Sequence, residues 1–520
     1  MKEKIQNNKL TILSALLVLI CMVFFTYLNW VDTDIFHLYY TGEYICKNGI
    51  PYENPFFVVE GYQTVIQQWL YDVILYKIGT LWGDTGFAFF TVIQLLSVYF
   101  LSVILLWNMK TNKKLSLFIP FFALGIMGYI NIRPQMISII LLLVELICME
   151  KYKNSKKLKS KILWLSIIPL TVIIEMNVHC TFWVFHLIFL MPYIFPYQIV
   201  PKSIRTHLKI VDTSISFIPF GVLMTLILLS AFINPYGLDG IMCMFNCLNS
   251  AINITEMNHM EIASSDFFNV LITWILYIIA YRKGKADSTA TFFLLGTTIL
   301  YIIVVRNSVF FFFGFLYTVS AFTKALNNEL VELINSKLNE KFNSIKLVKN
   351  NYMYIIFVVV GTVCLTFPKL DSDLNTQLKS KKLLTTFTPN FAVDYIKEHE
   401  KNISELNVLS SYNSGSFFLY NGIGHVYIDA KAEPYFDKIN KRKNILDEFV
   451  FLCDFGSEKD FDKFFSEYDF DYAFVEFRTN ALQLYLDKSD KFEEVAVSEE
   501  TIKPVKNYEV PVARLYKAVK

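Results

Sequence analysis

The stretch "LTILSALLVLICMVFFTYLNWVDTDIFHLYYTGEY", residues 10–44, joins two kinds of sequence. From Leu10 to Leu28 it contains no charged residue, and a helix of that length crosses a hydrocarbon core of about 30 Å. Asp32 and Asp34 follow the apolar run almost at once. The stretch therefore predicts a membrane-spanning helix with two carboxylates at the membrane surface.

The whole chain has the composition of a membrane protein. Of its 520 residues, 54% are hydrophobic and 18% are charged, whereas soluble domains have about 45–50% apolar and about 25% charged residues. Further apolar segments lie at 64–82, 87–107, 116–131, 134–149, 162–176, 180–197, 213–233, 266–281, 288–305, 307–323 and 351–368. We expect a polytopic α-helical membrane protein with about 11 transmembrane helices.

Residues 369–520 lose the membrane character and mix charged with aromatic residues. Strands are expected within 406–422, 425–436, 470–477 and 512–519, with helices between them. We therefore divide the chain into a transmembrane domain, 1–368, and a soluble α/β domain, 369–520.

Lysines in short loops predict the orientation, because cytoplasmic loops are enriched in Lys and Arg. Lys2, Lys4 and Lys9 place the N-terminus in the cytoplasm, and the lysine-rich run 151–161 marks another cytoplasmic loop. The number of membrane crossings agrees with the orientation of these loops if 64–107 makes one net crossing. The sequence does not decide whether 64–82 spans the membrane. The first external loop, 29–63, and the C-terminal domain then lie outside the plasma membrane.

Two arginines do not follow this rule for the distribution of positive charge. The chain has only seven arginines among its 48 basic residues, and Arg133 and Arg306 both fall at outside ends of spans. A guanidinium binds phosphate through two parallel hydrogen bonds and keeps its charge. Phosphate binding is therefore one interpretation, and a side chain that reaches up to the headgroups is the other.

Other polar residues gather at the same predicted face. "IEMNVHCTFW" (174–183) places Asn177 and His179 between two spans, and "ITEMNHMEI" (254–262) carries Glu256. Ionisable groups at membrane depth are costly and by default indicate function. The alternative is a polar turn in headgroup water.

The Asp32–Asp34 pair also has two interpretations. Such carboxylates can bind a divalent cation or accept a proton, or they can cap the helix that follows. Asp429, Lys431 and Glu433 form a second cluster after a predicted strand, where α/β proteins often bind ligands. No P-loop, GxGxxG, GxSxG or HExxH motif is present, so ATP-driven transport and ordinary hydrolase chemistry have no support.

Seven short motifs together resemble the GT-C superfamily of integral membrane glycosyltransferases. This superfamily includes protein O-mannosyltransferases and lipid A aminoarabinose transferases, and the likeness is greatest to uncharacterised bacterial members. The motifs are "DTDIFHLYYTGEYICKNGIPYENPF" (32–56), "NIRPQ" (131–135), "MNVHCTF" (176–182), "INPYG" (233–237), "ITEM" (254–257), "RNSVF" (306–310) and "YIDAKAEPY" (427–435). Lys431 stands where this pattern commonly has Arg, and Met257 where it usually has Trp.

The resemblance implies transfer of a sugar from a polyprenyl-phosphate or -diphosphate donor to an envelope acceptor outside the membrane. In such enzymes an acidic residue of the first external loop is the catalytic base or a metal ligand, which points to Asp34 first and Asp32 second. A basic residue binds the donor phosphate, which matches Arg133 or Arg306.

His179, Asn177 and Glu256 are expected to contact the substrate. The expected partners are thus a lipid donor and the membrane, with no nucleic acid. The sequence does not decide whether a divalent cation is needed, which sugar and acceptor are used, or the oligomeric state. The alternative function is a non-enzymatic membrane transporter or scaffold for cell-envelope polysaccharide.

Overall fold

The computed structural model describes most of the chain. The described residues are 2–28, 30, 32–127, 131–194, 200–215, 217–247, 259–262, 264–325, 388–431, 433–435, 439–477, 479–505 and 508–519. They belong to two compact units, each made of three pieces of chain. The helical unit comprises Met1–Val31, Asp84–Asn234 and Asn253–Asp371, and the α/β unit comprises Asp32–Gly83, Pro235–Ile252 and Ser372–Lys520.

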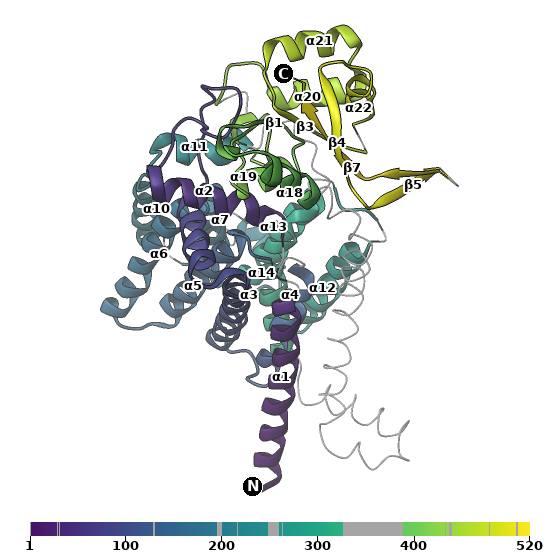
Figure 1. The fold of residues 1–520 in the computed structure, drawn as a ribbon. Helices are drawn as coiled ribbons and strands as arrows, with labels where there is room; N and C mark the ends of the chain where they lie inside the picture. Colours follow the sequence, from purple (N-terminus) through teal and green to yellow (C-terminus); the bar gives the residue numbers. More distant parts are fainter. Residues whose placement is uncertain are drawn as a thin grey trace, which may run out of the picture. The chain divides into compact units, whose positions relative to one another are not determined.

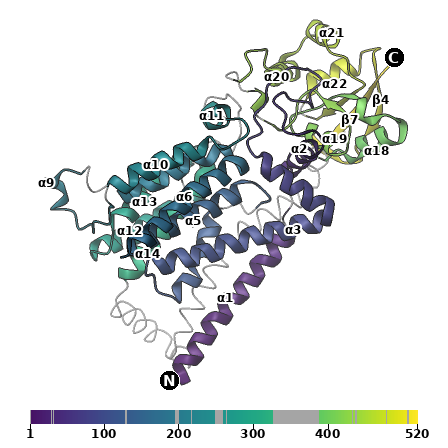
Figure 2. The same cartoon turned by 90° about the vertical axis from the view of Figure 1, so that its left-hand side faces the viewer.

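The helical unit is built from apolar helices (Figures 1 and 2). Its described elements are α1 (Lys2–Leu28), the second part of α3 (Trp69–Asn108), η1 (Leu115–Leu117), α4 (Ile119–Met127), α5 (Gln135–Asn154), α6 (Leu158–Val178), η2 (Cys180–Phe182), α7 (Trp183–Ile194), α9 (Lys202–Arg205), α10 (Phe217–Ala231), α12 (Ser265–Arg282), α13 (Ser288–Ile303), η4 (Val305–Asn307) and α14 (Ser308–Ala325). Helix α14 is buried along most of its length and packs against α13, α12 and α4. It therefore forms the centre of this unit.

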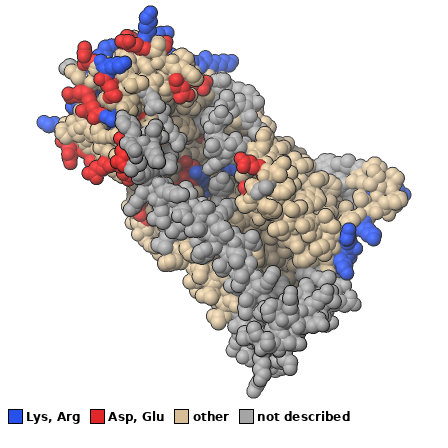
Figure 3. Space-filling view, turned by 90° about the vertical axis from the view of Figure 1, so that its right-hand side faces the viewer, with Lys and Arg blue, Asp and Glu red and all other residues tan. Residues whose placement is uncertain are grey.

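The outward surfaces of several of these helices are apolar, as a lipid environment requires. Leu13 and Leu17 of α1 are 63% and 61% exposed, and Ile218 of α10 is 83% exposed. In the face shown in Figure 3, Lys, Arg, Asp and Glu gather at the upper left, whereas much of the remaining described surface consists of other residues, apart from a basic group at the right. This distribution agrees with a multi-pass membrane protein.

Three helices among the described residues are long and apolar enough to cross a membrane. They are Trp69–Asn108, Leu158–Val178 and Val305–Ala325. Shorter apolar helices add Thr11–Tyr27, Leu115–Met127, Cys180–Ile194, Ile218–Ala231, Leu238–Cys247 and Ser288–Ile303. The number of about 11 crossings stays a prediction, and the expected span 351–368 lies outside the described residues.

The α/β unit contains a five-stranded sheet in the order β2-β1-β3-β7-β4. Strand β1 is parallel to β2 and β3, whereas β7 is antiparallel to β3 and β4. The strands are β1 (Asn407–Leu409), β2 (His425–Val426), β3 (Tyr472–Glu476), β4 (Phe492–Val497) and β7 (Ala513–Ala518), with a separate hairpin of β5 (Thr501–Val505) and β6 (Tyr508–Pro511). The expected C-terminal α/β fold is confirmed.

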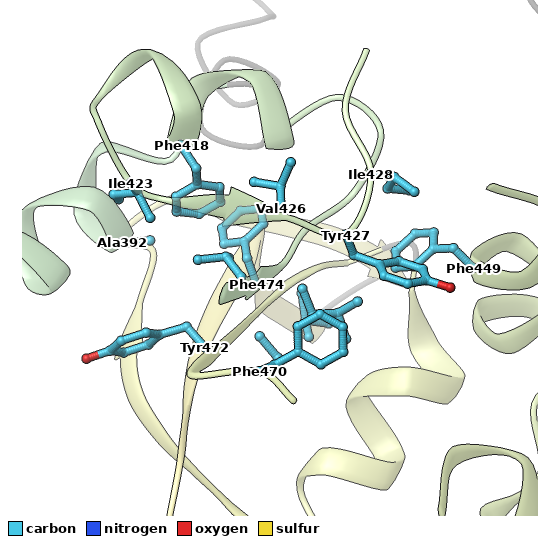
Figure 4. Packing of buried hydrophobic residues seen from close by; sticks show 14 of the residues in the cluster. Ala392, Phe418, Ile423, Val426, Tyr427, Ile428, Phe449, Phe470, Tyr472 and Phe474 are labelled. Carbon is cyan, nitrogen blue, oxygen red and sulfur yellow. The ribbon is translucent and has the colours of Figure 1, made fainter. Parts of the chain in front are cut away.

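The α/β unit also contains helices and short turns. They are α2 (Asp34–Asn48), the first part of α3, α11 (Leu238–Cys247), α18 (Asn390–His399), η6 (Ile403–Glu405), α19 (Gly415–Tyr420), η7 (Glu433–Tyr435), α20 (Ile445–Phe455), α21 (Glu458–Glu467) and α22 (Asn480–Leu486). Figure 4 shows Phe418, Tyr427 and Phe474 in the core of the sheet and helices. Each of these three side chains is at most 1% exposed.

The first external loop shares this core with the C-terminal tail. Tyr40, Phe57 and Tyr62 belong to the same buried cluster as the strands of the tail. The loop also continues the sheet, because Val58 N–H donates to Val426 O at 2.9 Å and Val426 N–H donates to Phe56 O at 2.9 Å. The loop thus covers the edge strand β2, which would otherwise present unpaired backbone groups. The predicted boundary at 368/369 lies outside the described residues and stays a prediction.

Helix α2 approaches the start of α3 at Gly42. A Cβ atom at this position would lie 2.0 Å from Asp72 O and 3.0 Å from Tyr76 Cβ. No real Cβ approaches a backbone atom so closely, so the two helices can touch only if residue 42 has no side chain. Helix α3 itself is broken at Gly83, whose φ of 58° lies in the left-handed region.

We predict that Gly42→Ala separates α2 from α3 and lowers the thermal stability of the full-length protein. The matched control is Gly296→Ala in α13, where an added Cβ meets nothing within 4 Å. Alanine is favoured over glycine in a helix by about 1 kcal/mol, so the control should be neutral or stabilising. Equal melting temperatures for Gly42→Ala and wild type would contradict the close packing.

Candidate functional site

The two carboxylates of the first external loop have different environments. Asp34 is the first residue of α2 and is half-buried, whereas Asp32 is only 7% exposed. Asp32 Oδ1 accepts a hydrogen bond from Asp34 N at 3.1 Å. Asp32 therefore caps an amide at the start of α2 that has no partner within the helix. Asp34 lies at the positive end of the helix dipole, which favours its ionised form.

Tyr40 joins α2 to the tail. It lies nearly two turns after Asp34, is 4% exposed, and its hydroxyl donates a short hydrogen bond to Asp429 Oδ2. Asp429 is fixed in turn, because its Oδ1 accepts from Lys431 N at 3.0 Å and its own N–H donates to the Tyr435 hydroxyl at 2.9 Å. Burial, and then the charge of Asp429, raise the pKa of Tyr40 well above its usual value. Tyr40 thus remains a neutral hydrogen-bond donor.

Lys431 places a buried cation beside this bond. Its side chain is 5% exposed, and Nζ lies 3.9 Å from Asp429 Oδ2. The same atom lies 4.4 Å from the ring centroid of Tyr40 and 3.9 Å from that of Phe56, which are cation–π distances. Burial lowers the pKa of Lys431, and the negative charges of Asp429, Asp72 and Glu433 oppose that effect.

Asp72 and Glu433 complete the buried cluster. Asp72 lies in the first turn of α3 and is fully buried, and neither of its carboxyl oxygens has a hydrogen-bond partner among the described residues. Glu433 is 3% exposed, and burial raises its pKa. Three ionised carboxylates around one ammonium would leave an excess of buried negative charge, which is costly. The raised pKa of Glu433 reduces that excess.

Sequence reasoning found part of this cluster. It identified Asp429, Lys431 and Glu433 but not Tyr40 or Asp72, which lie in the first loop and in the predicted segment 64–82. The available signal for Asp72 was its position in a predicted span that is unusually polar, with Gln67, Gln68 and Lys77 in the same segment. Nothing in the local sequence distinguishes Tyr40 from neighbouring tyrosines.

Four further predicted residues, Arg133, Asn177, His179 and Arg306, lie in the helical unit. Arg133 is in the turn before α5, and Arg306 is in η4 between α13 and α14. Asn177 Nδ2 donates to Ile173 O at 2.7 Å and to Ile233 O at 2.8 Å. Both amide hydrogens of Asn177 therefore fasten the end of α6 to the segment after α10.

His179 follows α6 directly and is 5% exposed. Its ring stacks on Phe182 with 4.3 Å between centroids, and Nδ1 lies 2.9 Å from Ser138 Oγ. Burial, and then the positive charge of Arg306, lower the pKa of His179 to about 3. The structure thus brings His179 under the electrostatic influence of Arg306 and keeps its imidazole neutral.

The predicted residues divide between the two units. Asp32 and Asp34 belong to the α/β unit, and Arg133, Asn177, His179 and Arg306 to the helical unit. Glu256 lies outside the described residues. One site shared by all of them stays a prediction.

The described residues do not form an evident metal site. No group of three or more His, Cys, Asp or Glu side chains among them could hold a metal ion. Asp32, one of the two predicted ligands, is already bonded to the backbone of α2. A divalent cation therefore stays an expectation from the family resemblance, and no step proposed below uses one.

No protein-family model and no curated protein sequence matches this chain. Several solved structures, however, match this chain. The oligosaccharyltransferase of Archaeoglobus fulgidus, tethered to an acceptor peptide with the NVT sequon, superposes with a TM-score of 0.56 and 11% identity over 89% of this chain and 69% of that one. Its apo form gives a TM-score of 0.53 at 11% identity with the same coverage, 89% and 69%. The chain therefore has the fold of these two oligosaccharyltransferase structures.

A further solved structure, ArnT from Cupriavidus metallidurans in the apo state, has a TM-score of 0.49 at 10% identity over 98% of both chains. The two oligosaccharyltransferase structures confirm, at the level of the fold, the resemblance that the sequence motifs suggested. The fold identifies the architecture that carries Asp34 and Arg133, and their roles remain proposals.

The buried Lys431 cluster leads to a stability prediction. Lys431→Met leaves Asp429 and its neighbours without their cation, and removal of one partner of a buried ion pair costs about 3–5 kcal/mol. Asp429→Asn in the same chain should recover part of this loss, so the two effects will not add. Denaturant titration of the full-length protein in detergent measures both.

The control for this prediction is Lys517→Met in the same unit. Lys517 Nζ lies 2.8 Å from Glu400 Oε1, but the two side chains are 36% and 25% exposed. Exposed ion pairs contribute about 0–1 kcal/mol. If Lys431→Met cost no more than this control, the cluster would not stabilise the α/β unit.

Proposed function

We propose that this chain is a glycosyltransferase that moves a sugar from a polyprenyl-phosphate-linked donor to an envelope acceptor on the outer face of the membrane. One observation carries the proposal: the GT-C fold, shared with an oligosaccharyltransferase over 89% of the chain. That protein was solved with an acceptor peptide. A lipid-linked donor also explains why an enzyme of this class needs no nucleotide-binding motif.

Asp34 is the proposed catalytic base. A carboxylate next to the acceptor hydroxyl takes its proton while the oxygen attacks the anomeric carbon, which inverts the configuration of the sugar. The environment of Asp34 supports this role, because the start of α2 favours its ionised form and its side chain is not fully buried. Asp32, the second candidate, is bonded to Asp34 N and supports the start of the helix.

Arg133 and Arg306 are the proposed ligands of the donor phosphate. As the bond to the anomeric carbon breaks, negative charge grows on the phosphate, and a fixed cation nearby stabilises it. His179, Asn177 and Glu256 are the proposed substrate contacts. Because Asn177 gives both amide hydrogens to backbone carbonyls, it would contact substrate as an acceptor.

The topology belongs to the same proposal. We place the N-terminus in the cytoplasm, about 11 crossings in the membrane and residues 369–520 outside the cell. This arrangement puts the first external loop and the tail on the same side. The packing of Tyr40 and Phe57 in the core of the tail supports it, because the two segments must meet to form one unit.

The alternative is a non-enzymatic transporter or scaffold for envelope polysaccharide. In that case the carboxyl group of Asp34 takes part in no reaction. The two functions therefore differ in the expected effect of a single isosteric substitution.

We predict that Asp34→Asn lowers the product at least about 100-fold, the usual contribution of a general base. Mass spectrometry of envelope glycans and glycolipids, from cells without the protein and cells complemented with each variant, measures the product. Arg133→Ala and Arg306→Ala test the phosphate ligands in the same experiment. Asp32→Asn keeps an oxygen that can cap α2 and should lose much less activity.

The matched control is Asp394→Asn, which alters an exposed carboxylate of α18 in the same unit. It should retain the wild-type product. If Asp34→Asn and Arg133→Ala both kept the wild-type product, the proposed mechanism would be wrong and the alternative would be favoured.

A further inference from the structure

A chain of polar side chains lies inside the helical unit. Its members are Ser138, Glu145, Glu175, His179 and His186, and they come from α5, α6, α7 and the turn after α6. Four of them are 0% exposed, and only His179 retains 5%. Ionisable groups buried among apolar helices are costly and indicate a function. His179 is therefore the member of this polar network that can contact a ligand.

The hydrogen bonds of Ser138 determine the tautomer of His179. Ser138 Oγ lies 2.6 Å from Glu175 Oε1 and 2.9 Å from His179 Nδ1. A hydroxyl has one hydrogen, and Ser138 donates it to the carboxylate. Ser138 must then accept from the imidazole, so His179 Nδ1 carries the hydrogen. In a neutral imidazole this leaves Nε2 as a hydrogen-bond acceptor.

Glu145 and His186 extend this arrangement beyond Glu175. His186 Nδ1 makes a short hydrogen bond with Glu145 Oε2, and its Nε2 lies 3.5 Å from Glu175 Oε2. The His186 imidazole thus lies between the carboxylates of Glu145 and Glu175. Glu175 Oε1 in turn accepts the hydrogen of the Ser138 hydroxyl.

Burial and the positive charge of Arg306 disfavour the cationic form of His179. Its burial and the charge of Arg306 hold its pKa at about 3, so the imidazole is neutral at physiological pH. The charged and titratable groups that act on it are Arg306 and, through Ser138, Glu175. The geometry agrees, because His179 stacks on Phe182, whose ring centroid lies 5.4 Å from that of Phe310, four residues after Arg306. His179 is thus a neutral acceptor in the part of the unit that carries the Arg306 cation.

We propose that His179 Nε2 accepts a hydrogen bond from a hydroxyl of the donor sugar, next to the phosphate bound by Arg306. The identity of the ligand rests on the proposed function. In a sugar phosphate, the phosphoryl group and the nearest ring hydroxyl are on adjacent carbons, which matches a cation beside a neutral acceptor. Ser138 and Glu175 are positioning residues, because they act only through the tautomer of His179.

Nitrogen NMR of the His179 imidazole tests the proposed tautomer without a substrate. The full-length protein, with ¹⁵N-labelled histidine rings, is placed in lipid nanodiscs, and His179→Gln assigns the signal. We expect a neutral ring with hydrogen on Nδ1, unchanged from pH 5 to pH 8. In Ser138→Ala the acceptor is lost, and the ring should change to the Nε2–H form.

The matched control is Ser102→Ala, because Ser102 is also fully buried and its Oγ donates to Val98 O at 2.7 Å. This variant should leave the His179 signal unchanged. A wild-type ring that is cationic or carries its hydrogen on Nε2 at pH 7 would overturn the proposal. So would a signal that does not change in Ser138→Ala.

Glycan mass spectrometry adds a functional test. His179→Ala should lower the product about tenfold, as expected for one lost hydrogen bond, while His179→Gln, which retains an acceptor oxygen, should keep most of it. If His179→Ala retained full product while Asp34→Asn abolished it, the recognition by His179 would be wrong and the proposed function would stand. If Asp34→Asn also retained full product, the proposed function itself would fail.

Discussion

The ammonium group of Lys431 cannot be buried without compensation, and this constraint organises the α/β unit. Its Nζ is surrounded by the rings of Tyr40 and Phe56 and lies 3.9 Å from Asp429 Oδ2. The aromatic rings come from the first external loop, and the cation and Asp429 come from the tail. Because isolated buried charges are very costly, neither segment can bury its groups alone. The loop and the tail therefore fold as one unit.

The position of the proposed catalytic carboxylate depends on this unit. Asp34 begins α2, and the same helix carries Tyr40, whose hydroxyl bonds to Asp429. Gly42 allows α2 to pack directly against α3. The helix is thus fixed on two sides, which is the rigidity that a general base requires. The tail contributes to the geometry of the first loop even though its own residues have no proposed chemical step.

Much of the architecture was predictable from the sequence, because the individual helices and strands depend on local sequence patterns. The apolar runs predict helices by composition alone, and the strands at 470–477 and 512–519 follow from their apolar pattern. The motif set predicted the GT-C fold. The pairing of Tyr40 with Asp429 was not predictable, because the two residues are 389 positions apart. The roles of Asp32 as a cap and Ser138 as a link likewise depend on three-dimensional neighbours.

The central claim is that the tail holds the helix that carries Asp34, and hydrogen exchange of the full-length protein tests it most directly. Tyr40→Phe removes the bond between α2 and Asp429, while the control Tyr427→Phe removes a 2.8 Å bond to Glu448 within the tail. We predict faster exchange of the amides of Asp34–Asn48 and less glycan product in Tyr40→Phe only. Unchanged protection of α2 and unchanged product in Tyr40→Phe would contradict the account.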